Sequence, residues 1–352
     1  NFTNSLLVGT DSTGTLSSAD GNTGVGTGVL AALTSGDNNV AVGLNALTAN
    51  TTASNSVAMG CGALTDNTIG DQNTAVGGTA LGDNTEGEYN AAFGYNALRK
   101  NTTADHGAAF GYYALACNTT GGNNTAVGTS ALRANTTGDQ NTSVGYESLK
   151  ANTTGINNSA VGQQSLTANT TGCNNAGLGR LALTANTEGD ENVAVGSCSL
   201  RRNTTGSNNT SLGACSLMCN TTASNNTAVG LCALNVNTTG ASNTAVGVSA
   251  LDSNTTGSNN IGVGASAGQA ITTGSSNTAV GQNSLQATTT SSNNTAIGLN
   301  SLYTNVTGAG NTGVGTSSLV LNTASNNTAL GFESLCKTTS GTSNVALGAY
   351  AM

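Results

Sequence analysis

The chain has 352 residues, of which only 7% are charged and 3% aromatic, and it contains neither proline nor tryptophan. Its formal net charge is -8, and with only eight Lys and Arg residues it lacks the dense basic surface that nucleic-acid binding requires. The longest apolar runs, such as Val29 to Leu33, fall far short of the roughly 20 residues that cross a bilayer. Composition therefore argues against a nucleic-acid-binding protein and against membrane insertion.

A glycine recurs every 17 residues from Gly9 through to Gly315, and after one 16-residue step the series ends with Gly331 and Gly348. We number each repeat from this glycine, which is position 0. The residue at position minus 1 is always a sizeable apolar one, and the residue at plus 4 is nearly always leucine. The consensus is Asn-Thr-Ala-Val-Gly-x-x-Ala/Ser-Leu-x-x-Asn-Thr-Thr-Gly-x-x. Self-similarity at a fixed period of this length is typical of one structural unit stacked many times.

The first predicted element of each repeat is the segment before the glycine. From Thr125 to Gly128 it alternates with a two-residue period and is rich in Val and Thr, which predicts a short strand. A second apolar pair, Ala131 and Leu132 in that repeat, predicts another short strand, and the Thr-Thr-Gly stretch after it predicts a turn. Seventeen residues are too few for two helices and their turns, and Asn, Thr and Gly are poor helix formers.

The repeat therefore predicts an all-β fold, a parallel β-solenoid or β-roll of about 21 coils with 17 residues per coil. Residues 1–352 are predicted to be a single continuous array, because every segment obeys one template. The 16-residue repeat agrees with this, since its missing residue falls in a predicted turn between Thr323 and Asn327. Because the chain begins within a repeat and stops at Met352 in the leucine column, we expect it to be an excerpt of a longer polypeptide.

The residue at position minus 2 is Ala, Gly or Ser in every repeat except the first. In a strand it points opposite to the apolar residue at minus 1, which we expect to face the coil interior together with the leucine at plus 4. Uniformly small side chains on the other face then indicate that this face is packed as well. We therefore expect a homotrimer of chains side by side, with their small-residue faces meeting near a shared axis; a lone solenoid is the alternative.

The segment from Asn55 to Gly60 reads Asn-Ser-Val-Ala-Met-Gly and resembles the head repeat of trimeric autotransporter adhesins. The full 17-residue unit is similar to repeats of long fibre proteins of bacteria and phages, and this resemblance covers essentially the whole chain. It implies a trimeric parallel β-roll in a surface fibre, where such an array commonly precedes a C-terminal intramolecular-chaperone domain. The period of 17 differs from the shorter period of the adhesin heads.

Two columns of asparagine, at positions minus 4 and plus 7, run through the repeats. They have two explanations: a ladder in which each amide bonds to the one above it, or glycosylation, because the plus 7 residue begins an Asn-x-Thr acceptor pattern. Glycans on successive coils would be about 4.8 Å apart and crowded, so we expect any modification to be partial or placed on Thr. The glycosylation candidates are Asn101, Asn135, Asn152, Asn203 and Asn254.

Cys198, Cys215 and Cys232 occupy position plus 2 of three consecutive repeats. Their expected spacing lies within the Cα range of disulfides, roughly 4.4 to 6.8 Å. One pair among the three is therefore a disulfide candidate, and the alternative is that these are small side chains filling a ladder. No Cys-x-x-Cys pair or partnering histidine suggests a zinc site.

Acidic residues gather at position plus 11, where Asp71, Glu88 and Asp105 belong to adjacent coils. Stacked carboxylates repel one another unless a cation lies between them, which makes these three the calcium candidate of the chain. The alternative is that they are solvated turn residues. No cofactor is expected.

Aromatic residues concentrate between Tyr89 and Tyr113. Tyr95 and Tyr112 share a column of neighbouring coils and form either a stacking platform for sugars or part of the ladder packing. The single histidine, His106, has no paired nucleophile or repeated acid partner, so no catalytic triad can be assembled. We do not expect an enzyme.

We expect the function to be mechanical and the location to be extracellular, on a cell or virion surface. The chain would be a fibre or stalk segment, as in an adhesin or tail fibre, that extends and presents a binding tip outside this excerpt. Its expected partners are further copies of itself, in a homotrimer or an end-to-end filament, and cell-surface glycans. The alternatives are a lateral carbohydrate-binding surface that uses Tyr95 and Tyr112, and a glycosylated self-assembling filament.

Overall fold

The computed structural model of the protein describes residues 5–9 and 17–352. The chain divides into two compact units, Asn1–Asn175 and Ala176–Met352. Each unit is an all-β parallel solenoid in which one repeat forms one coil, and the described residues contain no helix. The predicted fold is thereby confirmed for each unit, whereas residues 1–4 and 10–16 of the predicted array lie outside the described residues.

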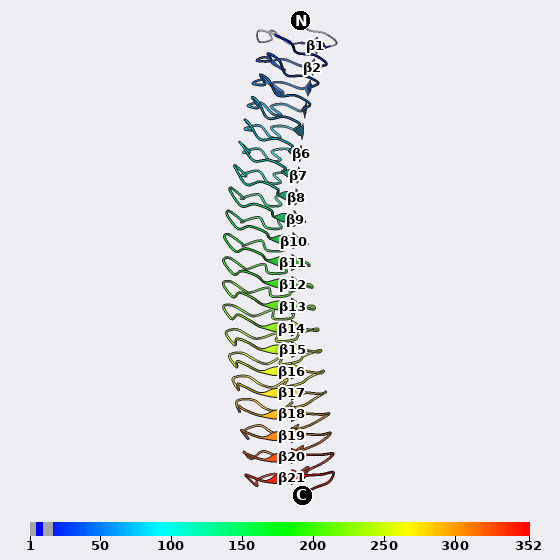
Figure 1. Ribbon diagram of the computed structural model, residues 1–352, viewed down its shortest axis with the longest axis vertical. Helices are drawn as coiled ribbons and strands as arrows, with labels where there is room; N and C mark the ends of the chain where they lie inside the picture. The colour runs from blue at the N-terminus through cyan, green and yellow to red at the C-terminus, as the bar shows by residue number, and fades with distance from the viewer. Residues whose placement is uncertain (1–4, 10–16) are drawn as a thin grey trace. The chain divides into compact units, whose positions relative to one another are not determined.

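Each described coil of the first unit contributes one strand of three residues. These strands are β1 (Leu6–Val8), β2 (Thr23–Val25), β3 (Val40–Val42), β4 (Val57–Met59), β5 (Thr74–Val76), β6 (Ala91–Phe93), β7 (Ala108–Phe110), β8 (Thr125–Val127), β9 (Thr142–Val144) and β10 (Ser159–Val161). Each strand pairs in parallel with the next one in chain order (Figure 1). Equivalent positions are opposite one another, as Ala126 is opposite Ser143.

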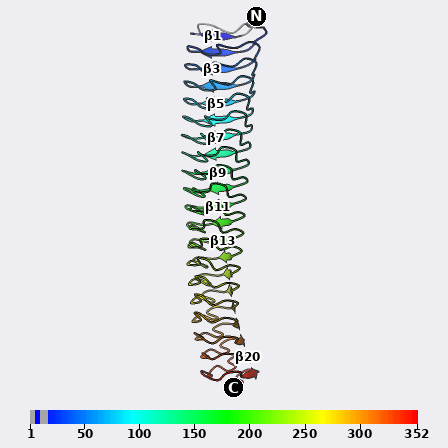
Figure 2. The ribbon, with the colours of Figure 1, turned by 90° about the vertical axis from the view of Figure 1, so that its left-hand side faces the viewer.

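The second unit repeats this arrangement, which Figure 2 shows from a second direction. Its strands are β11 (Ala176–Leu178), β12 (Val193–Val195), β13 (Thr210–Leu212), β14 (Thr227–Val229), β15 (Thr244–Val246), β16 (Ile261–Val263), β17 (Thr278–Val280), β18 (Thr295–Ile297), β19 (Thr312–Val314), β20 (Thr328–Leu330) and β21 (Val345–Leu347). The 16-residue repeat leaves the sheet register intact, because Thr312 pairs with Thr328. The connecting segment therefore absorbs the deletion, as a loop can more easily than a strand.

The small residue at position minus 2 faces the interior of its own coil, and the apolar residue at minus 1 faces outward. Ala126 is fully buried, whereas Val127 is 38% exposed. The opposite assignment, predicted from hydrophobicity, was wrong. The reason is the narrow interior: at Gly262, a glycine in the minus 2 column, an added Cβ would lie 2.8 Å from Cγ of Leu251. The plus 4 leucines fill the space, so after the first repeat this column holds only alanine, serine or glycine, and at Gly262 not even a methyl fits without a shift.

The predicted second strand is absent, because the segment from plus 1 to plus 6 is a run of turns. In every coil from that of Gly26 to that of Gly331, four positions, minus 5, 0, plus 2 and plus 4, have positive φ; in one coil these are Gln140 (58°), Gly145 (135°), Glu147 (54°) and Leu149 (46°). Repeated left-handed residues reverse the chain direction, which an extended second strand would not do. Successive turns still bond to each other, since the N–H of Leu149 donates to the carbonyl of Ser165 at 3.0 Å. The plus 4 leucines are buried as predicted.

The asparagines at position minus 4 line the interior and satisfy backbone groups there. Oδ1 of Asn124 accepts the backbone N–H of Asn141 in the next coil at 2.9 Å. Nδ2 of Asn141 donates to the carbonyl of Gly155 at 2.9 Å. Buried backbone polar groups must be paired, so this column holds the coils together where no strand does.

Candidate functional site

The outward side of the strands is the most extended candidate surface, and we call it the outer face. It consists of positions minus 3 and minus 1 of the strands in each unit, and no strand residue is charged. Side chains at minus 1 stack on one another, as the rings of Phe93 and Phe110 do at a centroid distance of 4.9 Å. More than a third of the surface is exposed in Val25, Met59, Phe93, Phe110, Val127, Val161, Leu178, Leu212, Val246, Ile297, Leu330 and Leu347. Continuous apolar surface of this kind marks an interaction site.

The five glycosylation candidates lie in a buried amide ladder at position plus 7. Nδ2 of Asn135 donates to Oδ1 of Asn118 in the preceding coil at 2.7 Å and to the carbonyl of Gly138 at 2.9 Å. The same two bonds are made by Asn101, Asn152, Asn203 and Asn254. All five side chains are fully buried. A glycan on Nδ2 would break this bonding and expel the amide from the core, so the folded coil does not offer these residues as acceptors.

The acidic column at plus 11 caps the backbone of the neighbouring coil. The N–H of Ser54 donates to Oδ1 of Asp71 at 2.6 Å, and the N–H of Glu88 donates to Oδ1 of Asp105 at 2.7 Å. Within residues 5–9 and 17–352, no group of three Cys, His, Asp or Glu side chains is arranged to hold a metal ion. The geometry therefore gives Asp71 and Asp105 a structural role.

The column of Cys198, Cys215 and Cys232 lies in the second unit, and none of the eight cysteines, all of which the structure describes, takes part in a disulfide. The N–H of Cys215 donates to the carbonyl of Ser197 at 3.0 Å, which keeps neighbouring plus 2 residues in register. Burial, and after it the nearby thiols of Cys198 and Cys232, raise the pKa of Cys215 above its ordinary value. Cys215 thus has a thiol with which it can form a disulfide in the coil on each side of it, Cys198 or Cys232.

We predict that oxidised glutathione forms one disulfide within this column, in which two thiols are oxidised while glutathione disulfide is reduced to two thiols. Cys215→Ser should abolish the bridge, because Cys198 and Cys232 are two coils, about 9.6 Å, apart. Cys198→Ser should keep it, between Cys215 and Cys232. Peptide mapping by mass spectrometry without reduction distinguishes these outcomes, and a Cys198 to Cys232 bridge in Cys215→Ser would contradict the stacking. Since the raised pKa leaves little thiolate at neutral pH, oxidation should become faster as the pH rises.

The structure brings Tyr95 and Tyr112 together with two further residues of the first unit. The rings of Tyr95 and Tyr112 stack at 5.8 Å with an interplanar angle of 16°. Tyr113 meets Tyr112 edge-on at 4.5 Å, and the guanidinium of Arg133 lies 5.0 Å from the centroid of the Tyr113 ring. His106 lies elsewhere in the coil and stacks on Tyr89 at 5.1 Å. The three tyrosines and Arg133 therefore form one continuous series of contacts that ends at a positive charge.

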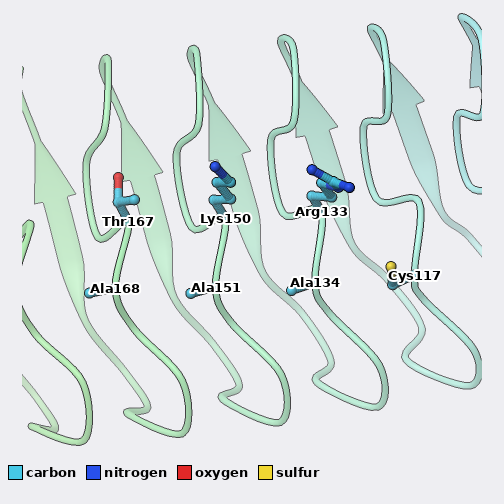
Figure 3. A pocket seen from close by; sticks show the side chains of 7 residues that line it. All are labelled: Cys117, Arg133, Ala134, Lys150, Ala151, Thr167 and Ala168. Atoms are coloured by element: carbon cyan, nitrogen blue, oxygen red, sulfur yellow. The ribbon is translucent and has the colours of Figure 1, made fainter.

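Beside Arg133 lies an open groove of about 600 Å³, which we call the plus 5 groove (Figure 3). One row of its lining comes from position plus 5 of successive coils, namely Arg133, Lys150 and Thr167. The other row comes from position plus 6 and consists of Cys117, Ala134, Ala151 and Ala168. The groove therefore has an apolar floor bordered by two cations.

The two cations of the groove differ in their partners. Lys150 donates to Oε1 of Glu147 at 2.7 Å, and Nε2 of Gln164 donates to Oε2 of the same carboxylate at 3.1 Å. These hydrogen bonds, that from Lys150 first, lower the pKa of Glu147 below its ordinary value. Arg133 makes no ion pair with any described residue. Arg133 is therefore the uncompensated charge of the plus 5 groove.

Sequence reasoning found Tyr95 and Tyr112 but missed Tyr113, Arg133 and the groove. Tyr113 and Arg133 occupy different positions, plus 2 and plus 5, in adjacent coils. A comparison of equivalent positions in the repeat therefore does not show that the two residues are close to each other. The available signal was the occurrence of both Arg133 and Lys150 beside the aromatic stretch in a chain with few cations.

Comparison of the sequence with models of known protein families and with curated proteins gives no match. The described part of the chain forms no helix with the length and hydrophobicity of a transmembrane span.

Proposed function

We propose that this chain is a structural fibre segment that assembles laterally with identical copies through the outer face. The observation that carries the proposal is the unbroken column of partly exposed apolar side chains at position minus 1 in both units. A protein that stays alone in water rarely leaves a continuous apolar surface of this kind uncovered. Copies of a chain with net charge -8 repel one another, but the strands that would meet carry no charge.

The area of the outer face is sufficient for a specific contact. Ten stacked strands span about 48 Å, and three strand residues span about 10 Å, so the first unit offers roughly 500 Å². Two copies meeting through this unit alone would bury about 1,000 Å², which is near the lower limit of specific interfaces. The second unit adds a face of similar size, since it has one strand more.

The proposed assembly is a homotrimer on a cell or virion surface, where the segment extends and spaces a binding tip carried by another part of the fibre. Support for three copies and for this location comes from the resemblance of the repeat to trimeric adhesin heads. The small residues at minus 2 do not support it, because they are buried within their own coils. In the proposed assembly the chains contact one another through the outer face, and not through the residues at minus 2.

Light scattering during size-exclusion chromatography tests the proposal. We expect a mass three times that of the 34.2 kDa chain. The double variant Val229→Lys and Val246→Lys should be monomeric while keeping its β-sheet circular dichroism, because charged side chains cannot be buried against a neighbour at low cost. A mass of one chain for the unmodified protein at tens of micromolar would contradict lateral assembly, and a mass of two chains would contradict the trimer.

A matched control places the same charges elsewhere on the same two coils. Thr239 and Thr256 are exposed at position plus 9, away from the strands. The double variant Thr239→Lys and Thr256→Lys should keep the mass of the unmodified protein. If it also dissociates, net charge and not the outer face controls assembly.

A further inference from the structure

We infer that the first unit carries a binding site for acidic carbohydrate, formed by Tyr95, Tyr112, Tyr113, Arg133 and the plus 5 groove. The site does not use the outer face, so the inference is independent of the proposed assembly. At this site, exposed aromatic rings, a guanidinium without a carboxylate partner among the described residues and a groove lie next to one another.

The aromatic part of the site is preorganised and accessible. Tyr95 is 51% exposed and Tyr112 is 54% exposed, although each ring contacts its neighbours. Tyr113 meets both, at 5.9 Å from Tyr95 and 4.5 Å from Tyr112. Such rings offer an apolar surface to the C–H groups of a sugar and a hydroxyl to its oxygens. Because the rings already hold one another in place, little side-chain freedom is lost on binding.

Arg133 supplies the selectivity for an acid. Its guanidinium is held over the Tyr113 ring at 5.0 Å and has no carboxylate partner among the described residues. A planar guanidinium binds a carboxylate with two parallel hydrogen bonds, and stacking on an aromatic ring leaves its N–H edge available for them. An acidic sugar placed on the tyrosines would therefore find its charge partner at Arg133.

The plus 5 groove extends the site along successive coils. From Cys117 to Ala168 it passes four coils, a distance of about 14 Å at one coil spacing per step. Its volume of about 600 Å³ lies within the usual range of ligand sites. The row of alanines provides a flat apolar floor, and Lys150 with Thr167 provides polar groups at its border (Figure 3).

The backbone around the groove favours a carbohydrate over an acidic peptide. The N–H of Ala134 donates to the carbonyl of Lys150 at 3.0 Å, and the N–H of Ala151 donates to that of Thr167 at 3.0 Å. These groups are used between coils and cannot pair with an added strand, which is how extended peptides gain affinity. A ligand that brings its own hydroxyls and carboxylate depends instead on the side chains that are present.

Isothermal titration calorimetry of the full chain with oligomers of galacturonic acid and of alginate uronic acids tests the inference. We expect at least one of these to bind, neutral hexose oligomers of the same length to bind at least tenfold more weakly, and Arg133→Gln to lose at least tenfold in affinity. Arg133→Lys, which keeps the charge but not the planar fork, should fall between the two. Circular dichroism of each variant checks its fold.

Arg201 provides the matched control, because it occupies the same plus 5 position in the second unit without a tyrosine in its neighbouring coils. Arg201→Gln should leave the affinity unchanged. Absence of binding to both uronic acid oligomers, equal binding of the neutral oligomers, or an equal loss in Arg201→Gln would overturn the inference. Equal binding of poly-glutamate would show a general anion site and would overturn the assignment to carbohydrate.

Discussion

Gly145→Ala is expected to destabilise the coils around it by about 3 to 5 kcal/mol. Two independent causes add at this position. The φ angle of Gly145 is 135°, a region that is essentially restricted to glycine, and an added Cβ would lie 2.6 Å from the carbonyl oxygen of Gly162 in the next coil. Relieving the clash would move a neighbouring backbone that is itself bonded to further coils. Hydrogen exchange of the amides in this and adjacent coils measures the loss as a local free energy of opening.

Gly155→Ala separates the two causes. An added Cβ at Gly155 would also approach the next coil, at the carbonyl of Gly172, but the φ angle of Gly155 is not positive. Alanine occupies the equivalent position, plus 10, at Ala53 and Ala104. Because an added Cβ at Gly155 would lie 2.4 Å from that carbonyl oxygen, closer than at Gly145, we expect the crowding alone to cost about 1 to 2 kcal/mol, less than half of the loss in Gly145→Ala. A similar loss in both variants would show that crowding alone, and not backbone conformation, requires the glycine at position 0.

Leu149→Ala is expected to cost about 2 to 5 kcal/mol, because it leaves a cavity in a narrow core. Leu149 is fully buried and has a φ angle of 46°. The left-handed conformation opposes every side chain, so Leu149→Gly should regain about 1 kcal/mol and be no more destabilising than the alanine variant. This reverses the usual order of the two substitutions. Urea denaturation of both variants, monitored by circular dichroism, provides the comparison.

Lys150→Gln is the control in the adjacent position. Lys150 is partly exposed and its ion pair with Glu147 is a surface pair, so its loss should cost at most about 1 kcal/mol. A loss as large as that of Leu149→Ala would contradict the assignment of plus 4 to the interior and plus 5 to the surface.

One coil shows that glycine can take the place of this leucine. Gly268 occupies plus 4 with a φ angle of 60°, and an added Cβ there would lie 2.9 Å from Cδ1 of Ile271. Ile271 stands at plus 7, where most coils have asparagine, and fills the space that the leucine side chain would occupy. The exchange interrupts the amide ladder, and Oδ1 of Asn254 consequently has no hydrogen-bond partner. The leucine at plus 4 and the asparagine at plus 7 are thus coupled through shared volume.

The period of the sequence was sufficient to predict a parallel stack, because a coil of constant length places like residues over like residues. The burial of the plus 4 leucines was predictable for the same reason. The direction of the strand was not, since Val127 is more apolar than Ala126 and yet points outward. The decisive quantity is the width of the coil interior, which depends on leucines in a left-handed conformation that is rare for a branched, bulky side chain.

The candidate binding site shows the same limit. Tyr95 and Tyr112 were identified because they share a column, and a column is visible in the sequence. Arg133 approaches Tyr113 from a different column of the adjacent coil, so the contact does not follow from a shared position in the repeat. A contact between columns depends on the path of the chain around the coil, which a repeat period does not describe.

A cryo-electron microscopy map of the protein that resolves side chains tests the central claim most directly, because it shows which way each strand residue points whatever the number of chains. We predict coils about 4.8 Å apart, with one short strand in each. Ala245 should lie against Leu251 inside its own coil, and Val246 should point away from that coil. Density that places Val246 inside and Ala245 outside, or that lacks the coil spacing, would contradict the account.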